Sequence, residues 1–366
     1  MNKYAVESGV TREMLKRSIV SEGNKARLAR VFRKALNGEK ISIGMIGGSL
    51  TQGAHASDYL KYSYTALVRD WWVENFPNAE IEYHNAGVGG TQSILGVHRV
   101  EGHILQYAPD FVIVEFAVND HAEEWQTEAY ANLVRRILSY PTAPAVMMLF
   151  NMGQSCDNVQ HAEIPVGKHY DLAMISQRDA LADEIKSGRI IWEDIAVDYV
   201  HPNDRGHMII AALICDYLDT VLKNIDSITD QELPLPEPMF SEKYMEARIF
   251  DYDHITPVSL GGSTYRYAEE EFWLTYRKYW RLEAGAEPLV FEVEGSRLLI
   301  LYEGGSTDKH KISVSVDGEE KRRIEGTTLD AGSAAIYTAY DGEDGKHTLA
   351  IYCDEGVFEI KAIMAS

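Results

Sequence analysis

Residues 43–58, IGMIGGSLTQGAHASD, begin as an apolar strand-like run, break at two glycines and continue into small and polar residues. Ser49 stands directly after the glycine pair. A phosphate-binding loop would require Lys at the position of Ala54, and the nucleophile elbow of α/β-hydrolases would require Gly where Thr51 stands, so neither motif is present. Two roles remain for Ser49: the cap of a helix, or a reactive group at the carboxyl end of a strand, where open α/β sheets place their sites.

Helical and strand-like segments alternate on both sides of this stretch. Apolar periodicity predicts helices at 24–38, 63–77, 93–109, 128–141, 171–188 and 206–224. Buried strands are predicted at 41–48, 81–87, 110–118 and 144–152. Strands that alternate with helices indicate a parallel sheet covered on both faces, a three-layer α/β/α domain. Ligands of such a domain bind at the carboxyl ends of the strands.

The pattern changes after residues 224–240, NIDSITDQELPLPEPMF, where three prolines fall within five residues and predict a linker. Short alternating segments bounded by Gly, Asp and Glu follow at 288–295, 297–305, 311–326, 334–340, 347–356 and 357–365. This spacing predicts an all-β, jelly-roll-like sandwich. We therefore expect an α/β domain over residues 1–235 and a β-sandwich over residues 236–366.

Composition excludes several classes of function. A net charge of -21 over 366 residues disfavours nucleic acid as a partner, because phosphate backbones require clustered Lys and Arg. The charged N-terminus lacks the apolar core of a secretory signal, and no run of about 18 apolar residues occurs, so we expect a cytoplasmic protein without a membrane partner. The cysteines, Cys156, Cys215 and Cys353, are too far apart for a zinc motif and are expected to be buried free thiols.

A reactive Ser49 requires a base, and usually an acid that orients the base. His201 is the strongest candidate base, because Asp198 lies three residues before it and a helix follows. The alternative is that both are ordinary loop residues near the start of that helix, with Asp204 as its cap. Two loops that follow strands offer donors for an oxyanion: HNAGVGG, with the backbone N–H of Gly90, and EFAVND, with the amide of Asn119.

The ordered blocks GGSLTQG, NAGVGG, AVND and DYVHPN resemble the four blocks of the SGNH, or GDSL-type, hydrolase superfamily. The resemblance covers roughly residues 41–224 and implies that Ser49 is the nucleophile, His201 the general base and Asp198 the group that orients His201. It also implies an oxyanion hole made by the N–H groups of Ser49 and Gly90 and the side-chain amide of Asn119. Two positions depart from the family pattern: Gly48 replaces the Asp of the GDS motif, and Ala117 stands where many members have Gly.

The order of an SGNH domain followed by a β-sandwich resembles carbohydrate esterase family 17, whose members deacetylate mannans and their oligosaccharides. The sandwich resembles a carbohydrate-binding module. This resemblance implies a cofactor-independent serine esterase for O-acetyl esters on oligosaccharides derived from plant polysaccharides, with acetylated mannan favoured and xylan next. Its activity is expected to rise with pH as His201 loses its proton.

Other functions stay open at this stage. The superfamily also contains lysophospholipases and thioesterases, and a sugar-binding protein on an inactive scaffold is a non-enzymatic alternative. Metal-dependent deacetylation is disfavoured because the motifs HRVEGH and HPNDRGH space their histidines at five and six residues, unlike helical zinc ligands, so no metal is expected.

Three aromatic residues are candidates for stacking on sugar rings. Trp125 lies six residues after Asn119, and Trp273 and Tyr276 lie in EFWLTYRKYW near the start of the second region. The alternative for each is packing within the core or between domains. A sugar-binding role predicts exposed rings beside Ser49, whereas a packing role predicts buried rings. The sandwich itself could also serve as the interface of a homo-oligomer.

Overall fold

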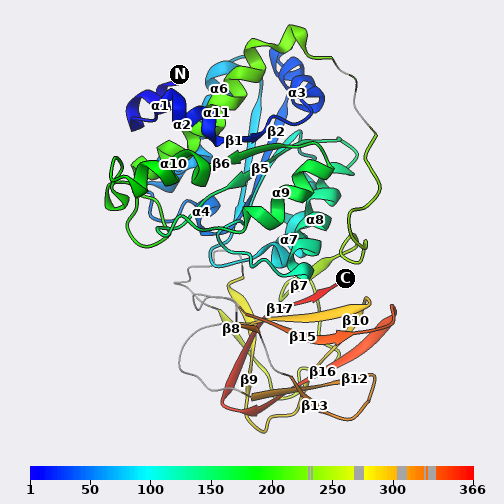
Figure 1. The fold of residues 1–366 in the computed structure, drawn as a ribbon. Helices are drawn as coiled ribbons and strands as arrows, with labels where there is room; N and C mark the ends of the chain where they lie inside the picture. Colours follow the sequence, from blue (N-terminus) through cyan, green and yellow to red (C-terminus); the bar gives the residue numbers. More distant parts are fainter. Residues whose placement is uncertain (230, 232–233, 268–275, 303–310, 325–326, 329–334) are drawn as a thin grey trace. The chain divides into compact units, whose positions relative to one another are not determined.

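The computed structural model describes residues 1–229, 231, 234–267, 276–302, 311–324, 327–328 and 335–366. The chain forms two compact units (Figure 1). The first comprises Met1–Gly87, Gln92–Gly96 and Val100–Glu242. The second comprises Val88–Thr91, Val97–Arg99 and Lys243–Ser366.

A six-stranded sheet forms the centre of the first unit, with the order β1-β6-β5-β4-β2-β3. Its strands are β1 (Ile19–Ser21), β2 (Ile41–Gly47), β3 (Ile81–Gly87), β4 (Phe111–Glu115), β5 (Ala145–Phe150) and β6 (Ala173–Ser176). All neighbours pair in parallel except β1, which is antiparallel to β6 at one edge. The predicted α/β fold is confirmed, with a mixed sheet that is mainly parallel.

Helices cover both faces of this sheet (Figure 1). One face carries α1 (Lys3–Ser8), α2 (Arg12–Ser18), α3 (Ala26–Leu36), α6 (Tyr64–Asn75), α10 (Gln177–Lys186) and α11 (Asp204–Lys223). The other carries α7 (Ser93–His103), α8 (Glu124–Leu138) and α9 (Gln160–His169). Alternate side chains of a strand point to opposite faces, so Met147 packs in the first core whereas Met148 lies against Gly167 of α9.

The strand register places the candidate loops at one edge of the sheet. Gly47, at the end of β2, pairs with Gly87 at the end of β3 and with Glu115 at the end of β4. The chain segments that carry Ser49, Gly90 and Asn119 therefore leave three neighbouring parallel strands at the same level. This edge of the sheet is where open α/β folds place their ligands.

Residues 171–188, predicted as one helix, instead form β6 followed by α10. A short apolar run such as Ala173–Ser176 has no periodicity that separates a buried strand from a helix, and here it pairs with β5. The helix α9 was not predicted either. It contains Pro165, which usually interrupts a helix, and its apolar periodicity is weak.

The second unit consists of two antiparallel sheets that share one hydrophobic core. One sheet contains β10 (Leu289–Glu294), β16 (Lys346–Glu355), β12 (Lys311–Val316) and β13 (Arg322–Ile324). The other contains β14 (Thr327–Thr328), β15 (Ala335–Asp341), β11 (Arg297–Tyr302), β17 (Val357–Ala365), β9 (Lys278–Glu283) and β8 (Thr264–Tyr267), and β7 (Arg248–Asp251) pairs with β17. The predicted all-β region is confirmed, and β7, β8 and β9 are additions to it.

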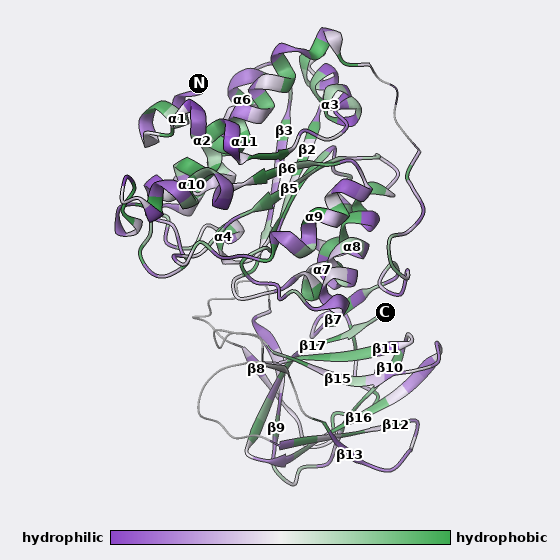
Figure 2. Cartoon of the chain, viewed as in Figure 1, coloured by the Kyte–Doolittle hydropathy of each residue, from purple (hydrophilic) through white to green (hydrophobic). Residues whose placement is uncertain are grey.

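Hydropathy explains the difference between the two sheet types. In the first unit, all residues of β2, β4 and β5 are buried, as expected for strands covered by helices on both faces. In β10, buried and more exposed residues alternate, because only one face of that strand meets the core. Figure 2 shows strands of the first unit largely in the hydrophobic colour, whereas the helices around them carry both hydrophobic and hydrophilic residues.

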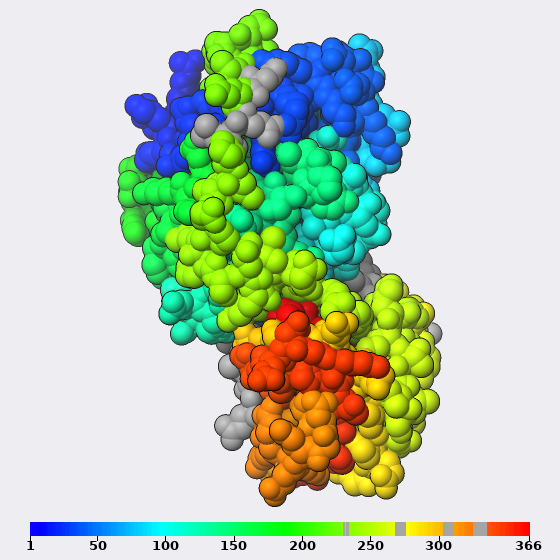
Figure 3. Space-filling view, turned by 90° about the vertical axis from the view of Figure 1, so that its right-hand side faces the viewer, coloured from blue at the N-terminus to red at the C-terminus, as the bar shows by residue number. Residues whose placement is uncertain are grey.

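The two units divide between Glu242 and Lys243, whereas the predicted boundary followed residue 235. The intervening segment is held on the first unit by hydrogen bonds. Arg135 of α8 donates from Nη1 to the carbonyl of Pro236 at 2.7 Å and from Nε to the carboxylate of Glu242 at 3.0 Å. Asn132 donates to the carbonyl of Ser241 at 2.9 Å. Figure 3 shows this segment, in yellow-green, along the surface of the first unit.

Two expectations from composition concern the whole chain. Cys156, Cys215 and Cys353 are free and buried, as predicted. Among the helices that the structure describes, none combines the length and the apolar character required to cross a bilayer.

Candidate active site

Ser49 is the first residue of the short helix α4 (Ser49–Gln52), which follows β2 directly. Its side chain is 4 % exposed. As the first helical residue, Ser49 has a backbone N–H without a partner inside the helix. Gly48 is needed before it for a steric reason: a Cβ at this position would lie 2.2 Å from Oδ1 of Asn119. The departure from the GDS motif thus leaves room for a side chain of the predicted oxyanion hole.

Ser49, His201 and Asp198 form a continuous hydrogen-bonded relay. The Oγ of Ser49 lies 2.9 Å from Nε2 of His201. The Nδ1 of His201 lies 2.7 Å from Oδ2 of Asp198. A carboxylate at Nδ1 keeps the proton there and leaves Nε2 free to accept the proton of the serine. This is the geometry that a serine nucleophile with its base requires.

A tight loop before α11 presents Asp198 and His201 together. A β-bridge between Ala196 and Pro202 closes the loop. Oδ1 of Asp198 accepts the backbone N–H groups of Val200 and His201 at 2.8 and 2.7 Å. The indole N–H of Trp192 donates to the Asp198 carbonyl at 2.6 Å. These bonds hold the carboxylate in place before any substrate binds.

The environment keeps Asp198 ionised. Partial burial alone would raise its pKa, but the N–H groups of His201 and Val200 and the His201 side chain together lower the pKa from 3.8 to about 2. Hydrogen bonds to the charged form of a carboxyl group have this effect. Asp198 therefore carries its negative charge throughout the neutral range and can stabilise a protonated His201.

The loops that carry the predicted oxyanion donors Asn119 and Gly90 have different local structures. Asn119 is half-buried, and its carbonyl accepts a hydrogen bond from Gln92 at 2.8 Å. The next residue, Asp120, accepts the backbone N–H of Ser93 at the start of α7 at 2.8 Å. Gly90 has a φ of 66°, a left-handed conformation that favours glycine, and its role in the oxyanion hole remains a prediction.

The start of α11 differs from the alternative in which Asp204 caps the helix. Asn203 is the cap, and its side chain accepts the N–H of Gly206 at 3.1 Å. Asp204 instead binds the loop after α4, accepting the N–H of Ser57 at 2.7 Å and its hydroxyl at 2.6 Å. The first turn of α11 thus joins the nucleophile loop to the loop of Asp198 and His201.

His207 fastens the same loop from a second point. Its Nδ1 accepts the backbone N–H of Tyr64 at 3.3 Å, so the proton lies on Nε2, which donates to the carbonyl of Ala54 at 3.1 Å. Burial is the main cause that lowers the pKa of His207 to about 4. His207 is therefore neutral at physiological pH and serves as a structural clamp.

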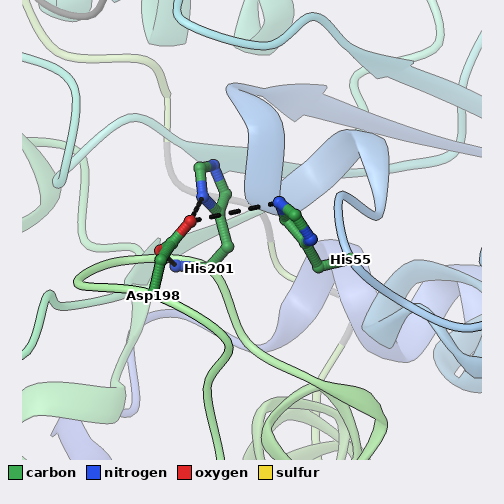
Figure 4. A group of neighbouring side chains, drawn as sticks. All are labelled: His55, Asp198 and His201. Atoms are coloured by element: carbon green, nitrogen blue, oxygen red, sulfur yellow. Dashed lines mark hydrogen bonds and ion pairs between the residues drawn. The ribbon is translucent and has the colours of Figure 1, made fainter.

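His55 is a site residue that the motifs did not reveal. Its Nε2 lies 4.0 Å from Oδ2 of Asp198, and its ring centroid lies 5.1 Å from that of His201 (Figure 4). It was hidden because it comes six residues after Ser49, on a different loop from Asp198 and His201, so no spacing rule connects the three. The sequence offered one signal for it, since His55 lies within residues 43–58, the same stretch as Ser49.

Three buried carboxyl groups near the same sheet edge were also missed. Glu115 ends β4, Asp120 follows Asn119, and Glu163 lies on α9. Burial raises the pKa of Glu115 to about 7, because its hydrogen bonds with Thr51 and Gly48 offset the cost of burial only in part. Burial also raises the pKa values of Asp120 and Glu163. Sequence gave no sign of them, because burial depends on the packed fold.

The aromatic candidates have different environments. Trp125 is half-buried in the first turn of α8. Tyr276 is 2 % exposed, which favours the packing role over stacking on a sugar ring. Trp273 lies outside the residues that the structure describes. Substrate contact stays a prediction for all three residues. Of Trp125 and Tyr276, Tyr276 is the less accessible.

Comparisons with known proteins agree with this site. Residues 45–209 match the model of the GDSL-like Lipase/Acylhydrolase family. This span contains Ser49, Asn119, Asp198 and His201. No curated relative matches the sequence.

Two solved structures resemble the chain over almost its whole length. One is a two-domain esterase (CEX) active on acetylated mannans, co-crystallized with mannopentaose, which has 29% sequence identity and a TM-score of 0.85 over 96% of this chain and 97% of that chain. The other is a structure of a two-domain esterase (CEX) active on acetylated mannans, with 28% identity and a TM-score of 0.86 over 96% of this chain and 98% of that chain. The predicted resemblance to GDSL-type hydrolases and the prediction of a carboxylic ester hydrolase are confirmed.

Proposed function

We propose that this chain, a carboxylic ester hydrolase that resembles GDSL-type enzymes over residues 45–209, removes O-acetyl groups from oligosaccharides of plant polysaccharides, with acetylated mannan as the preferred substrate and acetylated xylan next. Ser49, His201 and Asp198 form the catalytic triad of this proposal. The observation that carries it is the relay in which Nε2 of His201 lies 2.9 Å from Ser49 Oγ and Nδ1 lies 2.7 Å from Asp198.

The first half of the reaction acylates the enzyme. Nε2 of His201 accepts the Ser49 proton while Oγ attacks the acetyl carbonyl carbon, and the negative charge moves to the carbonyl oxygen. The N–H of Ser49, the N–H of Gly90 and the amide of Asn119 donate hydrogen bonds to that oxygen. The tetrahedral intermediate then collapses as protonated His201 gives its proton to the departing sugar oxygen.

The second half releases acetate. His201, neutral again, accepts a proton from water, and the resulting nucleophile attacks the acetyl-serine ester. Collapse of the second tetrahedral intermediate returns the proton to Ser49 Oγ. Asp198 stays ionised in both halves and stabilises the positive charge that His201 carries twice in each cycle.

The likeness to mannan esterases supports the choice of substrate. It extends through both units of the chain, since each comparison covers 96% of it. Two-domain architecture and the mannopentaose in one of those crystals favour an acetylated manno-oligosaccharide over a lipid ester. A net charge of -21 is also compatible with a neutral oligosaccharide.

The test measures acetate release from O-acetylated manno- and xylo-oligosaccharides at equal acetyl concentration. We expect release from both substrates, faster from the mannan-derived one, and none above background with Ser49→Ala. A para-nitrophenyl acetate assay runs alongside as a probe of the triad alone.

The outcomes separate the parts of the proposal. Release that persists in Ser49→Ala would overturn the role of Ser49. If Ser49-dependent hydrolysis of the aryl acetate occurs while neither oligosaccharide yields acetate, the triad stands and the carbohydrate substrate is wrong. A faster reaction with the xylo-oligosaccharide would reverse the stated preference.

A further inference from the structure

We propose that His55, Asp198 and His201 form a binding site for Zn²⁺, and that the bound ion switches the triad off. Their ligand atoms, two imidazole nitrogens and a carboxylate oxygen, all lie within 4.8 Å of one another. Among the described residues this is the one group of at least three His, Cys, Asp or Glu side chains with this closeness. Figure 4 shows the His55 ring directed towards Asp198.

The donor set suits zinc. Two His and one carboxylate are an established combination for Zn²⁺, with the fourth tetrahedral position left to water. The site is open to solvent, because the side chains of His55, Asp198 and His201 are 50%, 35% and 20% exposed. An ion can therefore reach the ligands without unfolding of the loops.

The distances require a small adjustment. Ligand bonds of about 2.0–2.2 Å in a tetrahedron separate the ligand atoms by roughly 3.3 Å. Asp198 Oδ2 lies 2.7 Å from His201 Nδ1 and 4.0 Å from His55 Nε2, so one distance is shorter and the other longer than this. Zinc must therefore separate Asp198 from His201 slightly and draw His55 inward.

The fold holds His55 ready for this role. The loop on either side of it is fastened to α11, at Ala54 by His207 and at Ser57 by Asp204. His55 itself has a φ of 63°, a left-handed conformation that is unfavourable for a non-glycine residue. The two attachments place the His55 backbone beside Asp198, and the His55 ring is directed towards that carboxylate (Figure 4).

Zinc at this site is incompatible with serine catalysis. In the relay, the proton of neutral His201 lies on Nδ1, and Nε2 accepts from Ser49. A metal ion on Nδ1 displaces that proton, so a neutral imidazole must carry its single proton on Nε2. Nε2 then has no lone pair for the Ser49 proton. The ion thus removes the general base without touching the nucleophile.

The same geometry accounts for the failure of spacing rules to detect a metal site. Helical zinc motifs bring two His together on one element. Here His55 comes from the nucleophile loop, whereas Asp198 and His201 come from the loop before α11. The ligand set exists only when these two loops meet at the sheet edge.

The experiment measures inhibition of para-nitrophenyl acetate hydrolysis by ZnCl₂, with the full chain, at a pH near 7.5. We expect complete inhibition that EDTA reverses. His55→Gln, with inhibition measured relative to its own zinc-free rate, should require at least about tenfold more zinc for half inhibition, because one of three ligands is lost. His161→Gln, a change at an exposed His on α9, is the matched control and should match the wild type.

A binding measurement makes the result independent of activity. Ser49→Ala retains all three ligands, and calorimetry should show one Zn²⁺ per chain, with an affinity at least about tenfold higher than in Ser49→Ala/His55→Gln. Equal zinc inhibition of wild type and His55→Gln, equal zinc affinity of the two Ser49→Ala chains, or activation by zinc would each overturn the proposal. Since the calorimetric arm uses no ester, it tests the zinc site even where the proposed esterase function fails.

Discussion

Asp198 and Glu115 are carboxyl groups of the same unit in opposite environments. Asp198 is partly exposed, accepts backbone N–H groups from Val200 and His201, and has its pKa lowered to about 2. Glu115 is fully buried at the end of β4, and its pKa is raised to about 7. The same functional group is therefore fully charged at Asp198 and only about half ionised near pH 7 at Glu115.

This difference has a chemical meaning. The reaction needs a fixed negative charge beside His201, where a positive charge develops. A negative charge near the loops of Ser49 and Asn119 would oppose the oxyanion that forms there. The raised pKa of Glu115 reduces such a charge, and burial also raises the pKa values of Asp120 and Glu163.

Asp198→Asn tests the charged side of the comparison and should have the largest effect. The amide keeps the shape of the carboxylate but favours the wrong tautomer of His201, so kcat should fall on the order of 10⁴-fold. Steady-state kinetics with para-nitrophenyl acetate measures this, with Asp194→Asn, at an exposed position, as the control. A loss below about tenfold would remove Asp198 from the triad.

Gly48→Ala and Asn119→Ala test the oxyanion hole and should rank second. The new Cβ at position 48 would lie 2.2 Å from Asn119 Oδ1 and must displace that amide. Both variants should lose on the order of 10²- to 10³-fold in kcat, with a smaller change in KM. Gly102→Ala, where a Cβ meets nothing within 4 Å, is the control. Full activity of Gly48→Ala would show that Asn119 does not need its present position.

Glu115→Gln tests the raised pKa of the buried carboxyl group. In the unfolded chain, a Glu ionises near 4.5, whereas folded Glu115 keeps its proton until about pH 7. The folded state therefore holds more protons between these values, and its free energy of unfolding must fall as pH rises from about 4.5 to about 7, by at most about 3 kcal/mol. Glu115→Gln removes this contribution.

Urea unfolding of wild type and Glu115→Gln at several pH values measures the effect. As pH rises to 8, the free energy of unfolding of Glu115→Gln should rise relative to that of the wild type. Asp198 does not interfere, because its lowered pKa affects stability only as pH falls below about 4 towards 2. Parallel pH profiles of the two chains would contradict a raised pKa of Glu115.

Asp204→Ala should have the smallest effect. This carboxylate joins the loop of Ser57 to α11 by two hydrogen bonds and touches no reacting atom. Loss of its two hydrogen bonds near the surface should cost about 1 kcal/mol in the free energy of unfolding. Asp157→Ala, at an exposed carboxylate, is the control. Equal stability of the two variants would show that the clamp on the His55 loop contributes nothing measurable.

Local sequence was sufficient to select Ser49, His201 and Asp198 as the candidate triad, because the signals for these residues are local. Asp198 and His201 lie three residues apart on one loop, and Ser49 follows a strand whose end is marked by glycines. Most helices and strands of residues 24–150 followed from periodicity for the same reason; the four-residue helices α4 and α5 (Tyr59–Tyr62) were not predicted. Prediction failed at residues 171–188, where a four-residue strand has too few positions for any period to appear.

Periodicity and short motifs could not predict contacts between segments that are distant in the sequence. Arg135 on α8 holds residues 236–242, so the first unit extends past the prolines that suggested a boundary at 235. The proximity of Gly48 to Asn119 joins residues that follow two different strands. Neither contact leaves a signature in the composition or spacing of the segments involved.

The sequence by itself determined the α/β and all-β regions and the candidates for nucleophile and base, because hydrophobic periodicity and short motifs act over a few residues. Only the tertiary structure decided that His55 joins Asp198 and His201, that Gly48 makes room for Asn119, and that burial raises the pKa of Glu115. These properties depend on which distant groups meet and on where water is excluded. Both are consequences of the packed fold and not of the neighbours along the chain.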